Sequence, residues 1–279
     1  MRTFSKIWLS IGLLSLFFGI AILIIVIISN PFDNEIRIAT TEGTYTGVEH
    51  IDFEIAYGDV EIIEGNSFSI NAVNLLKDEL ESYVSEGTWY IRANETNSIK
   101  LFGSSFQLKE LFGWREENIP KITITIPKDF VAGNFRLDIS AGQVEADTIH
   151  ANTGDFNVDA GRLSIDELSL SESSKYRVGA GEMVLKNVNL KDIDLECGVG
   201  RIQVEGTVIG DNSIETGVGD VSLLLKGNEN DYNYKFDVGI GDIEIDGYSH
   251  HRFDNIKNNE TGNLLNLECG IGKITVDFN

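Results

Sequence analysis

The sequence predicts an all-β fold: a single-stranded parallel β-solenoid (β-helix) of about 19–20 residues per coil, with an irregular β-rich N-terminal cap and one N-terminal transmembrane helix. Three observations predict it. A glycine motif recurs at a nearly fixed spacing, apolar and polar residues alternate on both sides of that motif, and one long segment near the N-terminus is uncharged. These features place the membrane helix at residues 7–29 and the solenoid at residues 48–279.

The recurring motif is a glycine followed by a polar or charged residue and then an aliphatic one, as in GVGRIQV at 198–204. Successive key glycines are 19, 20, 19, 19, 22 and 31 residues apart, a regular period that insertions stretch towards the C-terminus. Self-similarity at this period indicates a solenoid, in which each unit buries its apolar face only against its neighbours. The structural repeat glycines are Gly142, Gly161, Gly181, Gly200, Gly219, Gly241 and Gly272.

Alternation around the key glycine indicates strands with one buried face. Apolar residues stand two and four positions after each key glycine, as at Ile202, and three and five positions before it, as at Cys197. Because the phase is opposite on the two sides, we expect a corner at the motif, where glycine reaches backbone conformations closed to other residues. A third, shorter apolar pair, such as Val208 and Ile209, predicts a further side to each coil.

Two nearly identical octets, LECGVGRI at 195–202 and LECGIGKI at 267–274, occupy the same place in different coils. Their cysteines, Cys197 and Cys269, fall in an inward column and are expected to lie three coils apart. At about 4.8 Å per coil this is ~14 Å, beyond the roughly 7 Å limit between bridged Cα atoms. We therefore expect two unpaired core cysteines rather than a disulfide or a metal site.

Residues 7–29 contain no charged residue, and as a helix they would extend over ~34 Å, enough to cross a hydrocarbon core of about 30 Å. The run is longer than the apolar core of a cleavable signal peptide, and no A-x-A site follows it. Because Arg2 and Lys6 precede the run, the positive-inside rule places residues 1–6 in the cytoplasm and the rest outside. We expect a single-pass cell-membrane protein with residues 30–47 as a linker.

The exported part is strongly acidic. It carries 44 acidic and 20 basic residues, since Arg2 and Lys6 account for the other two of the 22, and its net charge is −24. Such a field repels nucleic acid and anionic lipid headgroups and favours cations or basic partners. Nucleic-acid binding is thereby excluded, and solvation of an exposed surface is the plain alternative to a basic partner.

Residues 48–135 form the irregular first part of the predicted solenoid, and residues 136–279 form its regular coils. An insertion at 99–118 combines several aromatic residues with a short helix predicted over 105–112. Exposed aromatic anchors dominate binding energy when a partner desolvates them. The candidate partner-docking residues are therefore Phe102, Phe106, Phe112 and Trp114. A cap helix packed on the open end of the solenoid is the alternative.

Residues that could carry chemistry are sparse. The insertion at 247–263 holds His250, His251, Asp254 and Glu260, but adjacent histidines in a polar loop are a weak signal, and we expect no metal site. A second insertion, 227–233, reads as a solvated loop. No G-x-S-x-G, phosphate loop, C-x-x-C or set of paired carboxylates with basic partners occurs, so we expect no catalytic residue, cofactor or small-molecule substrate. Calcium-binding solenoids would need a nine-residue period.

Repeated [AG]-x-G-D-[VI]-x-[VIL] tags, the strand ITITIPK at 122–128 and a single N-terminal anchor resemble the bacterial "putative adhesin" or toast-rack β-solenoid family, and in architecture its LiaG-like membrane-anchored members. The resemblance covers residues 48–279. It implies a β-solenoid without catalytic residues, set in the cell envelope beside the stress-response systems of Gram-positive bacteria.

We therefore expect a non-catalytic, membrane-anchored, extracytoplasmic binding or scaffold protein. Its role would be in the cell-envelope stress response or in surface interaction, with an envelope or stress-system protein as partner. The alternatives are a glycan-processing β-helix enzyme and a calcium-binding surface adhesin. Aligned carboxylates in an acidic groove would favour the enzyme, and an exposed apolar patch would favour a partner-docking protein.

Overall fold

The computed structural model describes residues 41–75, 79–93, 98–101, 104–107, 119–250, 256–257 and 259–279. All of them belong to the unit Arg37–Asn279. Within these ranges no helix is long and apolar enough to cross a membrane. The helix predicted at residues 7–29 lies outside the described residues and stays a prediction.

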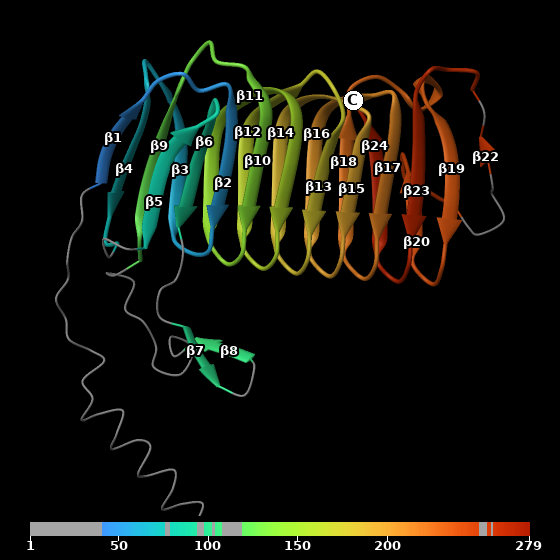
Figure 1. Ribbon diagram of the computed structural model, residues 1–279. Helices are drawn as coiled ribbons and strands as arrows, with labels where there is room; N and C mark the ends of the chain where they lie inside the picture. The colour runs from blue at the N-terminus through green and yellow to red at the C-terminus, as the bar shows by residue number, and fades with distance from the viewer. Residues whose placement is uncertain are drawn as a thin grey trace, which may run out of the picture. The chain divides into compact units, whose positions relative to one another are not determined.

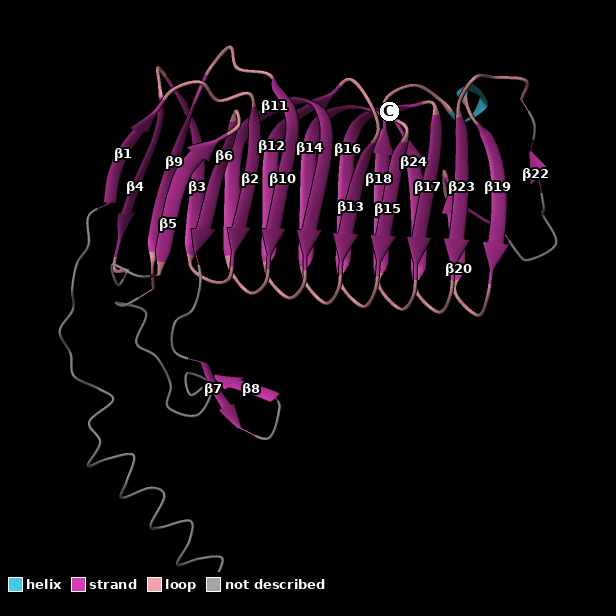
Figure 2. Cartoon of the chain, viewed as in Figure 1, coloured by secondary structure: helices cyan, strands magenta, loops and turns pink. Residues whose placement is uncertain are grey.

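Twenty-two strands form one sheet that winds into coils (Figure 1). Each coil has one strand before the glycine corner and one after it, and the corners are the row of turns along the lower edge of Figure 2. The strands before the corner are β2 (His50–Ile55), β6 (Thr88–Ala93), β10 (Ala132–Ile139), β13 (Ser174–Val178), β15 (Ile193–Cys197), β17 (Asp211–Thr216), β19 (Asn233–Val238) and β23 (Leu264–Cys269). Those after it are β3 (Asp59–Gly65), β9 (Lys121–Pro127), β12 (Arg162–Leu170), β14 (Glu182–Lys191), β16 (Arg201–Ile209), β18 (Asp220–Leu225), β20 (Asp242–Ile245) and β24 (Lys273–Phe278). The long strand β11 (Gln143–Val158) serves both purposes, following one corner and leading to the next.

Neighbouring coils pair in parallel at the predicted spacing. Arg162 of β12 pairs with Gln143 on one side and with Glu182 on the other, which are steps of 19 and 20 residues (162 − 143 and 182 − 162). Side chains alternate between buried and outward positions along the strands, and Ile202 of β16 is fully buried. An all-β parallel solenoid is therefore confirmed for the described residues.

The inward side chains stack from coil to coil and form the core. The ring of Phe156 lies parallel to that of Tyr176 in the next coil, with centroids 5.4 Å apart and an interplanar angle of 3°. The Tyr176 hydroxyl and the buried Ser174 hydroxyl lie within 3.0 Å of each other, so these polar groups satisfy each other inside the core. The repeat thus aligns like side chains with like along the axis of the stack.

The coils do not stack in sequence order at the C-terminal end. Strands β17 and β18 pair with β23 and β24, the last two strands of the chain, and these pair in turn with β19 and β20. The coil of Gly272 therefore lies between the coils of Gly219 and Gly241, as Figure 1 shows. The chain passes over one place in the stack between β18 and β19, and the insertion at 247–263 connects β20 to the strands that return to fill that place.

This order corrects the predicted separation of the two cysteines. Thr216 pairs with Cys197 on one side and with Cys269 on the other, so the cysteines are two coils apart and not three. Two steps of about 4.8 Å still exceed the roughly 7 Å that a disulfide allows. Both thiols are free and buried, and burial raises the pKa of each.

The N-terminal end is also assembled out of order. Strand β2 pairs with β10 on one side and with β6 on the other, so the chain builds an inner coil, adds an outer one and then returns. Antiparallel strands cover the outer edges at both ends of the stack, which protects them from pairing with another chain. These strands are β1 (Thr41–Tyr45), β4 (Phe68–Val73), β5 (Leu80–Ser85), β21 (Tyr248–His250) and β22 (Ile256–Lys257).

Two expectations for the irregular part are wrong. Strand β8 (Ser104–Gln107) pairs antiparallel with β7 (Ser98–Leu101), where a helix was predicted to begin at residue 105. Apolar residues that alternate with polar ones on both sides of a glycine favour a hairpin over a helix. The sheet also begins at Thr41, inside the stretch 30–47 that was expected to be a linker.

Two details of the regular part also differ from expectation. Ile209, expected to be the inward partner of Val208, is 41% exposed, and Gly206 takes the inward position beside buried Val208. The reason is a register shift between β14 and β16, which moves the alternation of inward and outward residues by one position. The insertion expected to be a solvated loop contains a 3-10 turn, η2 (Glu229–Asp231), and the buried Tyr232. The Tyr232 hydroxyl donates to the Val208 carbonyl at 2.8 Å, and burial raises its pKa to about 12.

Candidate binding surface at the glycine corner

The key glycine of each coil lies directly against the neighbouring coil. A Cβ atom on Gly200 would lie 2.1 Å from the carbonyl oxygen of Gly181 and 2.6 Å from Cγ1 of Val178. None of the seven key glycines has a positive φ, so the expected conformational reason for glycine is wrong. Glycine is needed because consecutive corners leave no space for a side chain.

The residue just before each key glycine points out of the coil. In four successive coils this residue is a large aliphatic one, and we call these four residues the corner ridge. In stacking order they are Val199, Val218, Ile271 and Ile240, with exposed fractions of 67%, 54%, 61% and 85%. At about 4.8 Å per coil the ridge extends over ~14 Å. Single exposed aliphatic residues are ordinary, whereas contiguous apolar patches mark interaction sites.

The backbone of the ridge is already used within the solenoid. The amide of Val199 donates to the carbonyl of Gly179 at 2.8 Å, and the amide of Val218 donates to that of Gly198 at the same distance. The ridge therefore offers side chains and not these backbone amides for contact, because the amides that could extend a sheet by strand pairing already have acceptors.

Three earlier coils carry alanine at the position of the ridge residues. These are Ala141, Ala160 and Ala180, and all three are exposed. Their corners make the same backbone bonds, as when the Ala180 amide donates to the Asp159 carbonyl at 2.7 Å. With Arg162 and the key glycines they line a shallow open groove. Because alanine serves the corner equally well, packing within the coil does not require the larger side chains of the ridge.

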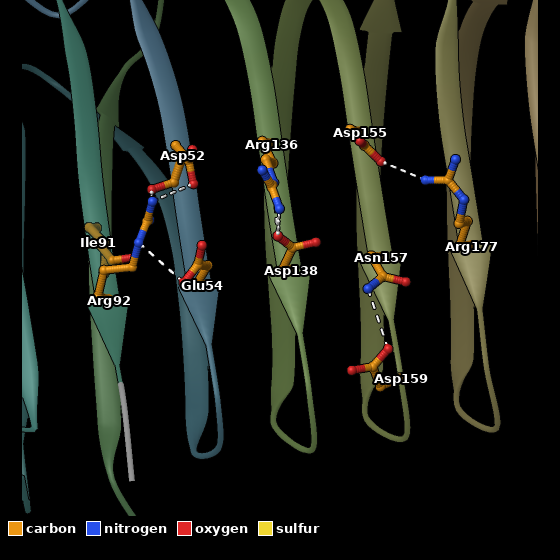
Figure 3. Close-up of polar contacts among 10 residues, drawn as sticks. All are labelled: Asp52, Glu54, Ile91, Arg92, Arg136, Asp138, Asp155, Asn157, Asp159 and Arg177. Carbon is orange, nitrogen blue, oxygen red and sulfur yellow. Dashed lines mark hydrogen bonds and ion pairs between the residues drawn. The ribbon is translucent and has the colours of Figure 1, made fainter. Parts of the chain in front are cut away.

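On the outer face before the corner, the first coils pair their charges (Figure 3). The Arg92 guanidinium lies 2.9 Å from Asp52 Oδ1 and 3.2 Å from Glu54 Oε2. Further along, Arg177 Nη1 lies 3.2 Å from Asp155 Oδ1. Cations and carboxylates thus neutralise one another over this half of the face.

The same face changes character beside the ridge. Four carboxylates stand in register on successive coils, and we call them the acidic ladder: in stacking order, Glu196, Glu215, Glu268 and Asp237. Arg177 reaches Glu196 at 3.5 Å, but the other three form no ion pair with any described residue. Burial raises the pKa of Glu215, and the charges of Glu268 and Glu196 raise it further. From Glu215 onward the ladder is a negative strip without ion pairs to the described residues, and it lies three positions before each ridge residue.

The predicted docking residues fall largely outside the described part of the chain. Phe102, Phe112 and Trp114 lie outside it, and Phe106 lies in β8, where its backbone pairs with Ile99. The insertion leaves the sheet after Ala93 and rejoins it at Pro120, so it takes the place that the glycine corner has in other coils. Docking by these aromatic residues stays a prediction.

The described part of the chain holds no cluster of potential metal ligands. Within it, no three His, Cys, Asp or Glu side chains are placed to hold a metal ion. The His250 ring stacks on Phe236, with centroids 4.8 Å apart, while His251 and Asp254 lie outside the described residues. The described glycine corners present apolar and acidic side chains at the surface.

Sequence reasoning missed both the corner ridge and the acidic ladder. The signals were present: the residue before the key glycine changes from alanine to valine or isoleucine at Val199, and acids recur four positions before the key glycine from Glu196 onward. The out-of-order coil of Gly272 keeps both rows continuous, because Ile271 and Glu268 fill the places between their neighbours.

The comparisons with known proteins concern the fold. Similar solved structures include a "putative cell adhesion protein" from Clostridium sporogenes, with 15% identity over 87% of this chain and 100% of that chain and a TM-score of 0.36. A "putative lipid binding protein" from Parabacteroides distasonis has 14% identity over 86% and 96% and a TM-score of 0.42. No curated protein sequence matches. The model of the Toastrack DUF4097 family matches residues 48–266, which is most of the chain, and the chain therefore belongs to that family.

Proposed function

We propose that this chain is a non-catalytic binding protein of the bacterial cell envelope that contacts a protein partner through the corner ridge. The observation that carries the proposal is the ridge itself. Its four aliphatic side chains stand in register and are 54–85% exposed, at a position where three earlier coils carry alanine. Removing apolar surface from water stabilises a complex by about 25 cal/mol per Å², so a partner would gain from covering it.

The membrane anchor and the envelope setting belong to the same proposal. The uncharged run at 7–29, with Arg2 and Lys6 before it, supports an anchor that leaves the solenoid outside the cell. The resemblance to LiaG-like proteins supports a place beside an envelope-stress system. The net charge of −24 after the anchor disfavours anionic lipid as the ligand, and a protein partner is favoured.

The test is site-specific photo-crosslinking in intact cells. A photoreactive residue at Val218 is compared with one at Val131, which is equally exposed (54% and 57%) but lies away from the glycine corners. We expect an adduct with an envelope protein from position 218 and none from position 131. Equal yields at both positions, or none from 218, would exclude the ridge as the contact surface.

The topology has a separate test. Protease added outside protoplasts should digest the chain beyond residue 30 while residues 1–29 remain with the membrane. Mature protein in the medium, with a new N-terminus near residue 30, would remove the anchor from the proposal and leave the ridge untouched.

A further inference from the structure

Resting on the proposed function, we infer that the partner presents an amphipathic helix to the ridge. One stripe of this helix is aliphatic and packs along Val199, Val218, Ile271 and Ile240. The flank of the helix that faces the acidic ladder carries Lys and Arg. Spacing and charge point independently to this kind of partner.

The spacing of the ridge fits a helix better than a strand. Ridge side chains recur every ~4.8 Å along the stack, and a helix repeats its apolar stripe every ~5.4 Å. Three intervals extend over ~14 Å along the ridge and over ~16 Å along the helix axis, so every side chain of the ridge meets one turn of the helix. Residues on one face of a strand are ~6.7 Å apart, which gives ~20 Å over three intervals and loses register.

Charge sets the orientation of the helix. The acidic ladder runs parallel to the ridge and lies three positions before it on every coil, within ~10 Å along the strand. The row immediately after the key glycine alternates in sign instead, through Arg201, Asp220, Lys273 and Asp242 in stacking order. One flank of the ridge is therefore negative and the other is mixed. A helix with Lys and Arg on one flank only matches this asymmetry.

The same charges disfavour two other occupants. A second copy of the chain would bring its own acidic ladder to the ridge, and like charges that face one another across an interface repel. A bilayer with anionic headgroups meets the same repulsion. Neither objection applies to a basic helix, because its apolar stripe would pack on the corner ridge and its cationic flank would face the acidic ladder.

The proposal is tested with synthetic peptides and the full-length protein in nanodiscs of zwitterionic lipid. The probe is a fluorescent 18-residue peptide with one leucine stripe at helical spacing, lysines on one flank and glutamines on the other. Two controls share its length: one has the same composition with leucine in strict alternation, and the other has glutamate for every lysine. Binding is followed by fluorescence anisotropy at low and at physiological salt.

The ridge variant combines Val199→Ala, Val218→Ala, Ile271→Ala and Ile240→Ala, and so gives each of these corners the Gly-Ala-Gly sequence that the corner of Gly181 already has. Its matched control is Val131→Ala with Ile209→Ala, which removes exposed aliphatic side chains elsewhere. A charge variant combines Glu196→Gln, Glu215→Gln and Glu268→Gln. Its control replaces the exposed Glu145, Glu167 and Glu205 by Gln on the strands after the corner.

We expect the helical lysine peptide to bind the wild-type protein. Its affinity should be at least tenfold lower for the ridge variant and, at low salt, severalfold lower for the charge variant. For the two control variants of the protein its affinity should stay within twofold of wild type. Equal binding of the alternating peptide or the glutamate peptide would overturn the proposal. So would an unchanged affinity of the ridge variant. A wild-type dimer that the ridge substitutions dissociate would identify a second copy as the occupant, and binding to vesicles without peptide would identify lipid.

These outcomes can be told apart from failure of the proposed function. A Val218 adduct in cells together with no preference for the helical peptide would reject the helix and keep the binding surface. Absence of the adduct would reject both.

Discussion

The alanine corners and the ridge corners form the same backbone hydrogen bonds to the neighbouring coil and differ in the residue just before the key glycine. Both have a key glycine pressed against the neighbouring coil, and both bond the middle amide to that coil, as Ala180 and Val199 do. The side chain just before the key glycine is a methyl group in one set and an exposed valine or isoleucine in the other. The difference shows which residues the coil requires, the glycines, and which it leaves open to other uses.

The outer face changes over the same coils. Arg92 and Arg177 neutralise the carboxylates of the first coils, whereas Glu215 and Glu268 of the acidic ladder form no ion pair with any described residue. Unpaired like charges in register reduce the stability of a sheet. The corner ridge and the acidic ladder, neither of which the fold requires, thus occur side by side, as expected of a binding surface.

The largest effect should come from the inward side of a coil. Ile202→Asp would bury a carboxylate at a position with no exposed surface, and we expect it to lower the free energy of unfolding by about 4 kcal/mol or more. Gln203→Asp, one residue along and exposed, should change it by less than about 0.5 kcal/mol. Urea unfolding measures both. Equal values would contradict the assignment of inward and outward faces.

The next effect tests the corner itself. Gly200→Ala places a Cβ atom 2.1 Å from the Gly181 carbonyl oxygen, and neither backbone can move without disturbing its hydrogen bonds. We expect a loss of about 3 kcal/mol. Gly262→Ala, where a Cβ atom meets nothing within 4 Å, and Val199→Ala should each change stability by less than about 0.5 kcal/mol. A neutral Gly200→Ala would show that close approach is not the reason for glycine.

The smallest effect concerns the acidic ladder. A raised pKa means that the folded state disfavours the charged form of Glu215, so its ionisation lowers stability as the pH rises through that pKa. Glu215→Gln should therefore raise the melting temperature by about 1–2 °C at pH 7. The gain should vanish below the ordinary Glu pKa of about 4.3, where the wild-type side chain is also neutral. Glu205→Gln, outside the ladder, serves as the control, and a gain that persists at low pH would contradict the electrostatic origin.

The repeat made the regular coils predictable from sequence, because each coil repeats the same inward columns around its key glycine. Ile202 and its counterparts needed only the period-two alternation to be placed inside. The stacking order was not predictable, since nothing in the local pattern distinguishes a chain that adds a coil from one that returns to fill a gap. The insertion at 247–263 is long enough to allow that return, but its sequence does not predict the order in which the coils stack.

The candidate surface was less accessible to sequence reasoning. Val218 and Glu215 each look ordinary alone, as one exposed aliphatic and one exposed acid. They form part of a continuous ridge and a continuous acidic row only because parallel pairing places Ile271 and Glu268 beside them. The reason for the key glycine was missed likewise, because a contact between consecutive coils is invisible until their spacing is known.

The central claim is that the corner ridge serves a partner and not the fold, and one measurement tests it most directly. A photoreactive residue at Ala180, next to the ridge, is crosslinked in cells in wild type and in the variant with alanine at Val199, Val218, Ile271 and Ile240. We predict that the adduct disappears in the variant while the melting temperature of the purified protein stays within about 2 °C. An adduct of unchanged yield, or a melting temperature that falls by about 10 °C or more, would contradict it.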